Sequence, residues 1–155
     1  MVVCLLRSIN SETFVFPRKF GRDLSGHVLA VGDASQSGLR IYERCGLSVT
    51  ECSNGKQAID ILKQHHYLVV LCDFKIVGMG SMDLLNRVSE SYPDIAFVMT
   101  VELQDLRYGI LAMIDGASGY IVKLQQSETV LRAMKVALVR NRLNRALACP
   151  RGSLG

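Results

Sequence analysis

The sequence has little of what marks several common protein classes. Its 155 residues include no Trp, only 3 Pro and only 3 His. No apolar run approaches the roughly 18 residues that a membrane-spanning helix needs, so we expect no membrane segment. The first residues lack the basic start and the apolar length of a signal peptide, which favours a cytoplasmic location over export.

The cysteines are few and scattered. They are 5 in number, at positions 4, 45, 52, 72 and 149, and no two form a C-x-x-C pair. An odd number without such pairs disfavours both a disulfide framework and a zinc site. We therefore expect small, reduced cysteines packed in the interior.

What is present is the composition of one globular domain with an uneven charge. The chain is 49% hydrophobic and 21% charged, with a net charge of +4. Residues 127–155 carry six cations and one acid, whereas the remainder is close to neutral. Such a basic segment can bind a partner protein or a nucleic acid, but a solvated helix face is the simpler interpretation. Direct nucleic-acid binding is disfavoured because no second helix would orient this one in a groove.

From residue 27 onward, short apolar runs alternate with amphipathic segments. The runs are 28–31, 47–49, 67–72, 95–99 and 120–122. Runs that are apolar throughout, and rich in Val, Ile and Leu, are typical of parallel strands covered on both faces.

The intervening segments have helical spacing. We expect a helix after Ser35 that Gly46 ends, and a second that Asn54 opens. A third surrounds residues 84–88, and the last runs from about residue 130 to Leu147. In the fourth, the apolar steps of 3, 4 and 3 predict one helical face. That face consists of Leu103, Leu106, Ile110 and Met113.

The alternation amounts to five strand–helix units. Right-handed crossovers make such a chain an α/β protein with a doubly wound parallel sheet, for which the order 2-1-3-4-5 is common. We expect one domain over residues 27–147, an N-terminal extension over 1–26 and a tail over 148–155.

Polar residues follow four of the apolar runs. Asp33 follows the first, Asp73 the third, Thr100 the fourth and Lys123 the fifth. Because the carboxyl ends of parallel strands meet at one edge, these side chains should gather there. Two carboxylates suit Mg²⁺ with retained waters, and a carboxylate can also act as the nucleophile that becomes an acyl phosphate. A lysine and a hydroxyl would then stabilise the phosphoryl oxygens.

This arrangement resembles the receiver domains of two-component response regulators, the family of the bacterial chemotaxis response regulator. The resemblance covers about residues 27–147 and implies their flavodoxin-like (βα)5 fold. It rests on VLAVGDAS at 28–35, LVVLCDFKIVGMGSMDLL at 68–85, IAFVMT at 95–100 and DGASGYIVK at 115–123.

The resemblance implies a role for each candidate residue. Asp73 would accept a phosphoryl group from a histidine kinase or a phosphotransfer protein. Asp33, Asp73 and the backbone carbonyl of Lys75 would bind Mg²⁺, and Lys123 would pair with the phosphoryl group. Thr100 and Tyr120 would form the conformational switch. A domain of this kind is not a turnover enzyme.

Several positions depart from the family pattern. The adjacent acids after the first strand are here Gly32 and Ala34 on either side of Asp33. The other departures are Ile76-Val77 for Met-Pro, Gly80-Ser81 for Asp-Gly, Val101 for a small residue and Leu124 for Pro.

Three functions follow as hypotheses. The leading one is a receiver whose helix 4–strand 5–helix 5 face contacts a separate output protein, since only about 8 residues follow Leu147. Self-association as a homodimer stays open. The second is a pseudo-receiver, a binding or dimerisation module that works without phosphorylation. The third is a small phosphatase-like enzyme with Asp73 as nucleophile, but Asp73-Phe74-Lys75 lacks the Asp-x-Asp expected there.

Overall fold

The computed structural model describes residues 26–35, 47–123 and 127–148. The helix expected after Ser35 falls largely within 36–46 and lies outside the described residues. The same is true of nearly all of the extension over 1–26 and of the tail over 148–155. None of the helices in the described ranges is both long enough and apolar enough to cross a membrane.

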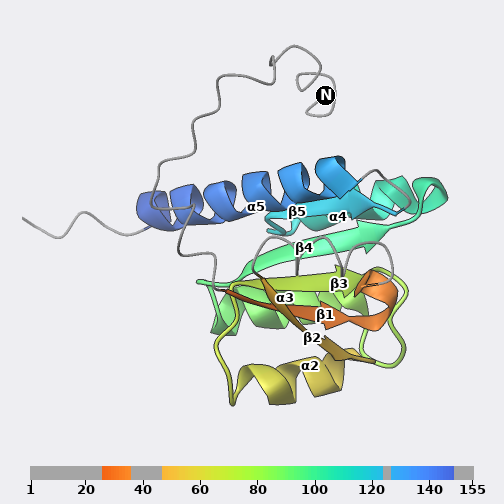
Figure 1. The fold of residues 1–155 in the computed structure, drawn as a ribbon, viewed down its shortest axis with the longest axis horizontal. Helices are drawn as coiled ribbons and strands as arrows, with labels where there is room; N and C mark the ends of the chain where they lie inside the picture. The colour runs from red at the N-terminus through yellow and green to blue at the C-terminus, as the bar shows by residue number, and fades with distance from the viewer. Residues whose placement is uncertain (1–25, 36–46, 124–126, 149–155) are drawn as a thin grey trace, which may run out of the picture.

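Five parallel strands form a single sheet in the order β2-β1-β3-β4-β5, which confirms the predicted topology (Figure 1). The strands are β1 (His27–Val31), β2 (Ser48–Cys52), β3 (Val69–Asp73), β4 (Ala96–Val101) and β5 (Gly119–Val122). The carboxyl ends of β1, β3, β4 and β5 therefore meet at one edge.

The described helices cover both faces of this sheet (Figure 1). They are η3 (Gly32–Ser35), α2 (Gly55–Leu62), α3 (Ser81–Ser91), η4 (Leu103–Asp105), α4 (Leu106–Ile114) and α5 (Ser127–Ala148). The cores show which helix lies where: α2, α3 and α4 share one buried cluster, and α5 shares the other.

Alternate residues of the central strands enter the two cores. In β3, Val70 and Cys72 pack with α2, α3 and α4, whereas Val69 and Leu71 pack with α5. Both faces of a covered parallel strand are buried, which explains the uninterrupted apolar run. Cys72 is buried under these helices, which confirms for this residue the expected packing in the interior.

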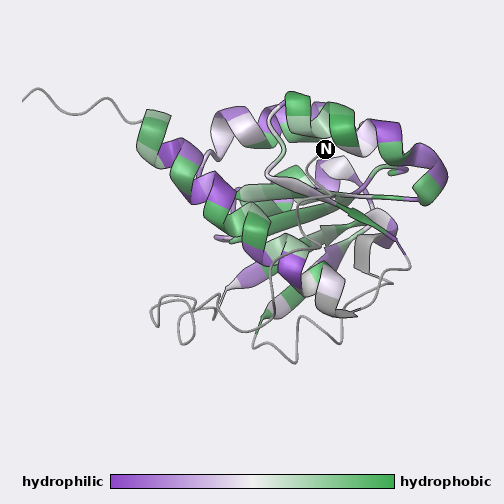
Figure 2. Cartoon of the chain, turned by 90° about the horizontal axis from the view of Figure 1, so that it is seen from above, coloured by the Kyte–Doolittle hydropathy of each residue, from purple (hydrophilic) through white to green (hydrophobic). Residues whose placement is uncertain are grey.

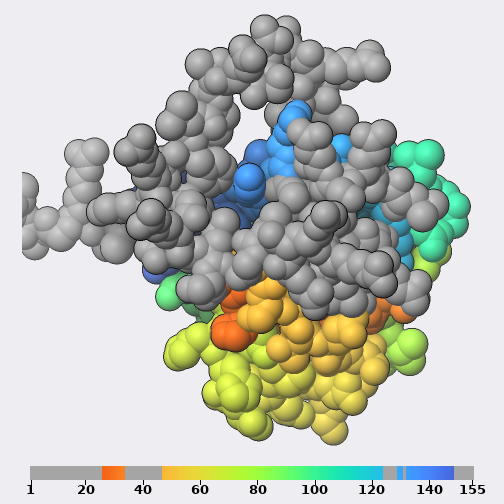
Figure 3. All heavy atoms as spheres, viewed as in Figure 1, coloured from red at the N-terminus to blue at the C-terminus, as the bar shows by residue number. Residues whose placement is uncertain are grey.

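The edge strand β2 differs from this pattern. It runs to Cys52 rather than ending at Val49, and its residues are exposed or half-buried. Figure 3 shows the orange and yellow atoms of β2 and α2 together at the surface in the lower part of that view. An edge strand with one open side needs no continuous apolar run, so the apolar pattern located only its first residues.

Helix α2 begins where the sequence places its cap. Asn54 adopts an extended backbone, and its side chain accepts a hydrogen bond of 3.0 Å from the Gln57 amide. In return, the Gln57 side chain accepts one from the Ser53 amide. The cap satisfies amides that the helix leaves unpaired, which fixes its start.

Helix α4 and the short η4 before it bury only part of their apolar stripe. Leu103 is 74% exposed and Ile110 is 49% exposed, whereas Met113 packs against the core. The fully buried residues of α4 are Gly109 and Ala112. Small residues lie inward because the Tyr120 ring of β5 already fills the space beside Gly109.

Helix α5 has the predicted course. Val130, Met134, Ala137 and Leu138 are buried against the sheet, and the helix continues to Ala148. Figure 2 shows its distal turns extending beyond the strands, with hydrophobic and hydrophilic residues alternating along them.

Candidate functional site

The site forms around Asp73, the last residue of β3. Its side chain is almost wholly buried, with 4% of the residue exposed. Strand pairing places Asp73 beside Thr100 of β4, and the Phe74 amide donates to the Thr100 carbonyl over 2.9 Å. A charged carboxylate at the end of an apolar strand requires a partner close by.

Lys123 is that partner. Its Nζ lies 2.6 Å from Asp73 Oδ2, and the two side chains are 17% and 6% exposed. The Lys123 amide donates to the Val101 carbonyl over 2.8 Å, which extends the pairing of β5 with β4 to the edge of the sheet. The other oxygen, Asp73 Oδ1, accepts a hydrogen bond of 3.2 Å from the Lys75 amide. The fold thus brings residues fifty positions apart into direct contact.

Thr100 contributes an unpaired hydroxyl. Its Oγ1 is buried and has no hydrogen-bond partner within the described part of the chain. A buried hydroxyl without a partner costs about 1–3 kcal/mol, which makes Thr100 Oγ1 a candidate donor to a group bound beside Asp73.

Asp33 lies in η3, directly after β1, and is exposed. The preceding residue, Gly32, has φ +73, a conformation that glycine adopts readily. A Cβ on Gly32 would lie 3.3 Å from Asp73 Cβ and 2.8 Å from Ile76 Cγ2. Where the family carries an acid, this chain therefore places the side chain of Ile76 against glycine.

Two contacts that sequence reasoning missed join the β3–α3 loop to the start of α4. Lys75 Nζ forms ion pairs with Glu102 at 3.1 Å and with Asp105 at 3.0 Å. These bonds, first to Asp105 and then to Glu102, raise the pKa of Lys75 above its ordinary value. No sequence signal pairs these residues, because the fold alone brings the two loops together.

The second contact is aromatic. The rings of Phe74 and Tyr108 stack with centroids 4.1 Å apart and planes 17° apart, and the Arg107 guanidinium lies 4.8 Å from the Tyr108 centroid. The residue next to Asp73 thus touches α4 directly.

Tyr120 is half-buried in β5 and packs against α4. A Cβ on Gly109 would lie 2.9 Å from Tyr120 Cγ, so the ring occupies the space that this glycine leaves. Val101 is wholly buried in the cluster that α2, α3 and α4 cover. Its side chain, larger than the small residue of the family pattern, therefore packs in the core.

The thiols of Cys52 and Cys72 have low reactivity at neutral pH. Burial raises the pKa of Cys52 to about 11. Burial, followed by the charge of Asp73, raises the pKa of Cys72 further. Both thiols stay protonated at neutral pH and are poor nucleophiles there.

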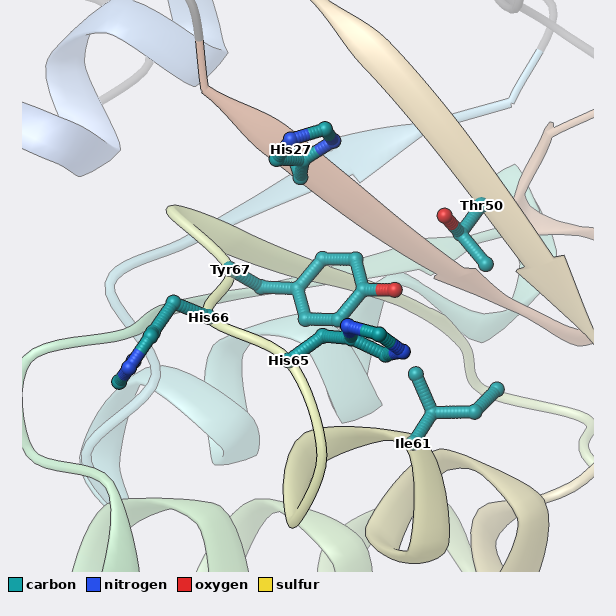
Figure 4. A pocket seen from close by; sticks show the side chains of 6 residues that line it. All are labelled: His27, Thr50, Ile61, His65, His66 and Tyr67. Carbon is teal, nitrogen blue, oxygen red and sulfur yellow. The ribbon is translucent and has the colours of Figure 1, made fainter.

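A separate pocket of about 550 Å³ lies at the opposite edge, near the amino ends of β1 and β3 (Figure 4). Its lining includes His27, His65 and Tyr67, whereas His66 points away from the other side chains in that view. Among the described residues, no three His, Cys, Asp or Glu side chains are placed to hold a metal ion. Asp73 is not among the residues that line this pocket.

The sheet order β2-β1-β3-β4-β5 defines a flavodoxin-like doubly wound fold, and a buried aspartate–lysine pair lies at its carboxyl edge. The model of the response regulator receiver domain matches residues 33–135, and the chain belongs to this family. Family membership agrees with the expectation that the domain is not a turnover enzyme.

Individual relatives agree with this assignment. The transcriptional regulatory protein YkoG of Bacillus subtilis is 24% identical over 119 residues, which cover 75% of this chain and 52% of YkoG. The nitrate/nitrite response regulator NarL of Escherichia coli is 28% identical over 92 residues, or 57% of this chain and 41% of NarL. The chain thus spans about half or less of the curated relatives that it matches.

A solved receiver domain from Clostridium thermocellum superposes with a TM-score of 0.66 at 26% identity. The match covers 77% of this chain and 98% of that one. The chemotaxis response regulator CheY4 of Vibrio cholerae matches with a TM-score of 0.61 at 22% identity, over 72% of this chain and 98% of that one. At 22% identity, the match to CheY4 supports the fold alone.

Proposed function

We propose that this receiver domain accepts a phosphoryl group on Asp73 from a histidine kinase or a phosphotransfer protein, and that the modification changes its protein contacts. The observation that carries the proposal is the contact of 2.6 Å between Lys123 Nζ and the buried Asp73 Oδ2. An ammonium held there is placed for the oxygens of a phosphoryl group on the same carboxylate.

The residues at this edge fit Mg²⁺. Asp33 and Asp73 offer carboxylate oxygens and Lys75 offers its backbone carbonyl, and Mg²⁺ prefers such oxygen ligands together with waters. Gly32 removes one acid from the set, so we expect weak Mg²⁺ affinity. When bound, Mg²⁺ would neutralise charge on the phosphoryl oxygens.

The protein's own groups supply the remaining chemistry. An Asp73 oxygen attacks phosphorus, the P–N bond of the donor phosphohistidine breaks, and the imidazole nitrogen leaves with the electron pair. The product is an acyl phosphate on Asp73. Lys123 moves from the carboxylate to the phosphoryl oxygens, and Thr100 Oγ1, unpaired in this state, donates to one of them.

The change would reach the surface through β5 and α4. Tyr120, whose ring rests on Gly109 of α4, would follow the movement of Thr100 by changing its rotamer. The proposed output face consists of η4, α4, β5 and α5, and its exposed apolar residues include Leu103 and Ile110. A population shift between two packings of this region is sufficient for signalling.

The decisive experiment is incubation with acetyl phosphate and Mg²⁺, followed by intact-mass measurement. A single phosphoryl adduct is expected. It should be absent in Asp73→Asn and after chelation, and retained in Asp60→Asn, a matched change of an exposed aspartate on α2. No adduct on the wild-type chain would contradict the proposal.

The packing at Gly32 supports a second candidate, a pseudo-receiver that binds partners without phosphorylation. Ile76 fills the space that a side chain at position 32 would enter, so the acid that would support Mg²⁺ binding is absent. Beryllofluoride separates the two candidates: with Mg²⁺, it should shift the amide spectrum of a receiver and leave that of a pseudo-receiver unchanged.

A further inference from the structure

The two residues that follow the candidate phosphoacceptor both reach the start of α4 with their side chains. Phe74 stacks on Tyr108 of α4. Lys75 forms ion pairs with Glu102 and Asp105, which lie just before that helix. These five residues are here called the α4 clamp. The clamp joins the end of β3 to the amino end of α4, at the edge of the sheet where the candidate site lies.

Both acids of the clamp forgo the role that their positions favour. Glu102 is the N-cap residue of η4 and Asp105 is the N-cap residue of α4, yet neither side chain accepts a capping hydrogen bond. An aspartate at this position normally accepts one from an amide of the first turn. Here the two carboxylates lie 3.1 and 3.0 Å from Lys75 Nζ instead. Capping of the helices therefore does not account for their orientation.

The charged contact of the clamp is a network and not an isolated pair. Lys75 Nζ pairs with two carboxylates, and Glu102 also accepts a hydrogen bond of 2.6 Å from Gln104 Nε2. The Asp105 side chain is 17% exposed, which limits the screening of its charge. Networks of this kind hold a geometry better than single exposed ion pairs do. The stacked rings add an apolar contact to it.

The backbone of the clamped segment serves the site itself. The Lys75 amide donates to Asp73 Oδ1 over 3.2 Å, and the Phe74 amide donates to the Thr100 carbonyl over 2.9 Å. The Lys75 carbonyl is the proposed third protein ligand of Mg²⁺. The side chains that contact α4 thus belong to the residues whose backbone orients the phosphoacceptor and would orient the metal.

The rest of the β3–α3 loop is restrained from another side. Val77 is 79% exposed, and Gly78 has φ +84. A bridge between Val77 and Asn54 ties this part of the loop to the start of α2, away from α4. A loop with few buried contacts opens at low cost, so the clamp supplies the restraint on the α4 side.

We propose that Asp105 and Tyr108 are positioning residues for the site at Asp73. Acting through Lys75 and Phe74, they hold in place the amide that is bonded to Asp73 and the carbonyl that is proposed for Mg²⁺. The assignment rests on the proposed function, since it concerns the phosphorylation of Asp73.

The clamp differs from the proposed switch of Thr100 and Tyr120. It acts on metal binding before phosphorylation, whereas the switch acts on the change that follows. Groups that orient metal ligands from behind typically change metal affinity by about 10- to 100-fold when they are removed. The clamp includes exposed ion pairs, which contribute less. We therefore expect a change of about three- to tenfold in Mg²⁺ affinity when either contact is lost.

The test measures the rate of phosphorylation of the full chain by acetyl phosphate, read by intact mass, over a series of Mg²⁺ concentrations. In Tyr108→Leu and in Asp105→Asn, the Mg²⁺ concentration that gives half the maximal rate should rise about three- to tenfold. The maximal rate at saturating Mg²⁺ should change by less than about twofold, because the reacting groups are intact. Tyr108→Phe keeps the stacked ring and should behave as the wild type.

Matched changes separate positioning from a general loss of stability. Tyr67→Leu removes a half-buried tyrosine at the opposite edge of the sheet, and Asp115→Asn removes a charge at the other end of α4. Both should leave the half-saturating Mg²⁺ concentration unchanged. A variant that is partly unfolded lowers the maximal rate without moving this concentration, and circular dichroism measures the unfolded fraction.

A second readout needs neither metal nor phosphate. Hydrogen exchange of the Lys75 amide, followed by NMR in Mg²⁺-free buffer, reports how often its bond to Asp73 Oδ1 is formed. The exchange should accelerate by about threefold or more in Tyr108→Leu and in Asp105→Asn. The Leu71 amide in the middle of β3 reports global unfolding, and the acceleration at Lys75 should exceed the one at Leu71.

Several results would overturn the proposal. One is an unchanged half-saturating Mg²⁺ concentration in both variants, whatever the exchange rates. Another is unchanged exchange of the Lys75 amide, since the clamp would then not hold that bond. A third is a loss in Tyr108→Phe equal to that in Tyr108→Leu, because the stacked ring would then have no part in it.

Failure of the proposed function is seen separately. A wild type that forms no adduct would contradict phosphorylation of Asp73 and the positioning role with it. That result appears in the wild type, whereas a failure of the positioning role alone appears in the variants of a wild type that is phosphorylated.

Discussion

Gly32 and Ile76 occupy one another's space beside the candidate phosphoacceptor: a Cβ on Gly32 would lie 2.8 Å from Ile76 Cγ2. A side chain added at position 32 therefore has to displace Ile76.

Gly32→Asp should destabilise the domain instead of repairing its metal site. The positive φ and the contact with Ile76 together should cost about 2–3 kcal/mol in the free energy of unfolding, measured with urea. With Ile76→Ala, the added carboxylate has room. The double variant should then show a larger Mg²⁺-dependent rise in Tm than Ile76→Ala alone. Equal Mg²⁺ responses would show that position 32 does not limit metal binding.

The pair of Asp73 and Lys123 should appear as a strong energetic coupling. Lys123→Gln leaves a buried carboxylate without its counter-ion and should cost about 2–3 kcal/mol of stability. In a double-mutant cycle with Asp73→Asn, the loss should be smaller than the sum of the single losses by about 1–3 kcal/mol. Additive losses in urea unfolding would mean that the two side chains do not interact in solution.

Gly109→Ala should reverse the usual sign of a helix substitution. Alanine normally stabilises a helix interior relative to glycine by about 1 kcal/mol. Here its Cβ would lie 2.9 Å from Tyr120 Cγ, so we expect a loss of about 1–3 kcal/mol. In a Tyr120→Ala background the ring is gone, and the same change should become stabilising. The measurement is the Tm of the wild type, of the two single variants and of the double variant.

Lys75 should make stability depend on alkaline pH. Its ion pairs with Asp105 and Glu102 raise its pKa in the folded state above the ordinary 10.5. The folded state therefore holds this proton more tightly than the unfolded state, and the stabilisation is complete below pH 10.5. It disappears as the pH rises through the folded-state pKa.

The comparison of wild type with Lys75→Met isolates this contribution from that of other lysines and tyrosines. Wild type should be more stable near pH 9, and the difference should shrink above pH 10.5. Urea unfolding at a series of pH values measures it. A difference that stays constant with pH would indicate that packing of the Lys75 stem, not its charge, joins the two loops.

Much of the fold follows from local sequence patterns. The uninterrupted apolar runs at β1, β3 and β4 predict strands covered on both faces, because a strand exposes alternate side chains to opposite sides. Asn54 predicts the start of α2 from its own capping chemistry. Asp73, Thr100 and Lys123 were placed together because parallel strands share one carboxyl edge.

The sequence by itself determined the order of the elements and the edge at which the chemistry gathers, since both depend on residues that are neighbours along the chain. Only the tertiary structure decided which face of α4 is buried, because Tyr120 arrives from another element. It also decided that Ile76 fills the place beside Gly32 and that Lys75 reaches Asp105. These contacts join side chains from different loops and depend on their volume and charge. Because the residues are far apart along the chain, no periodicity in the sequence predicts that they meet.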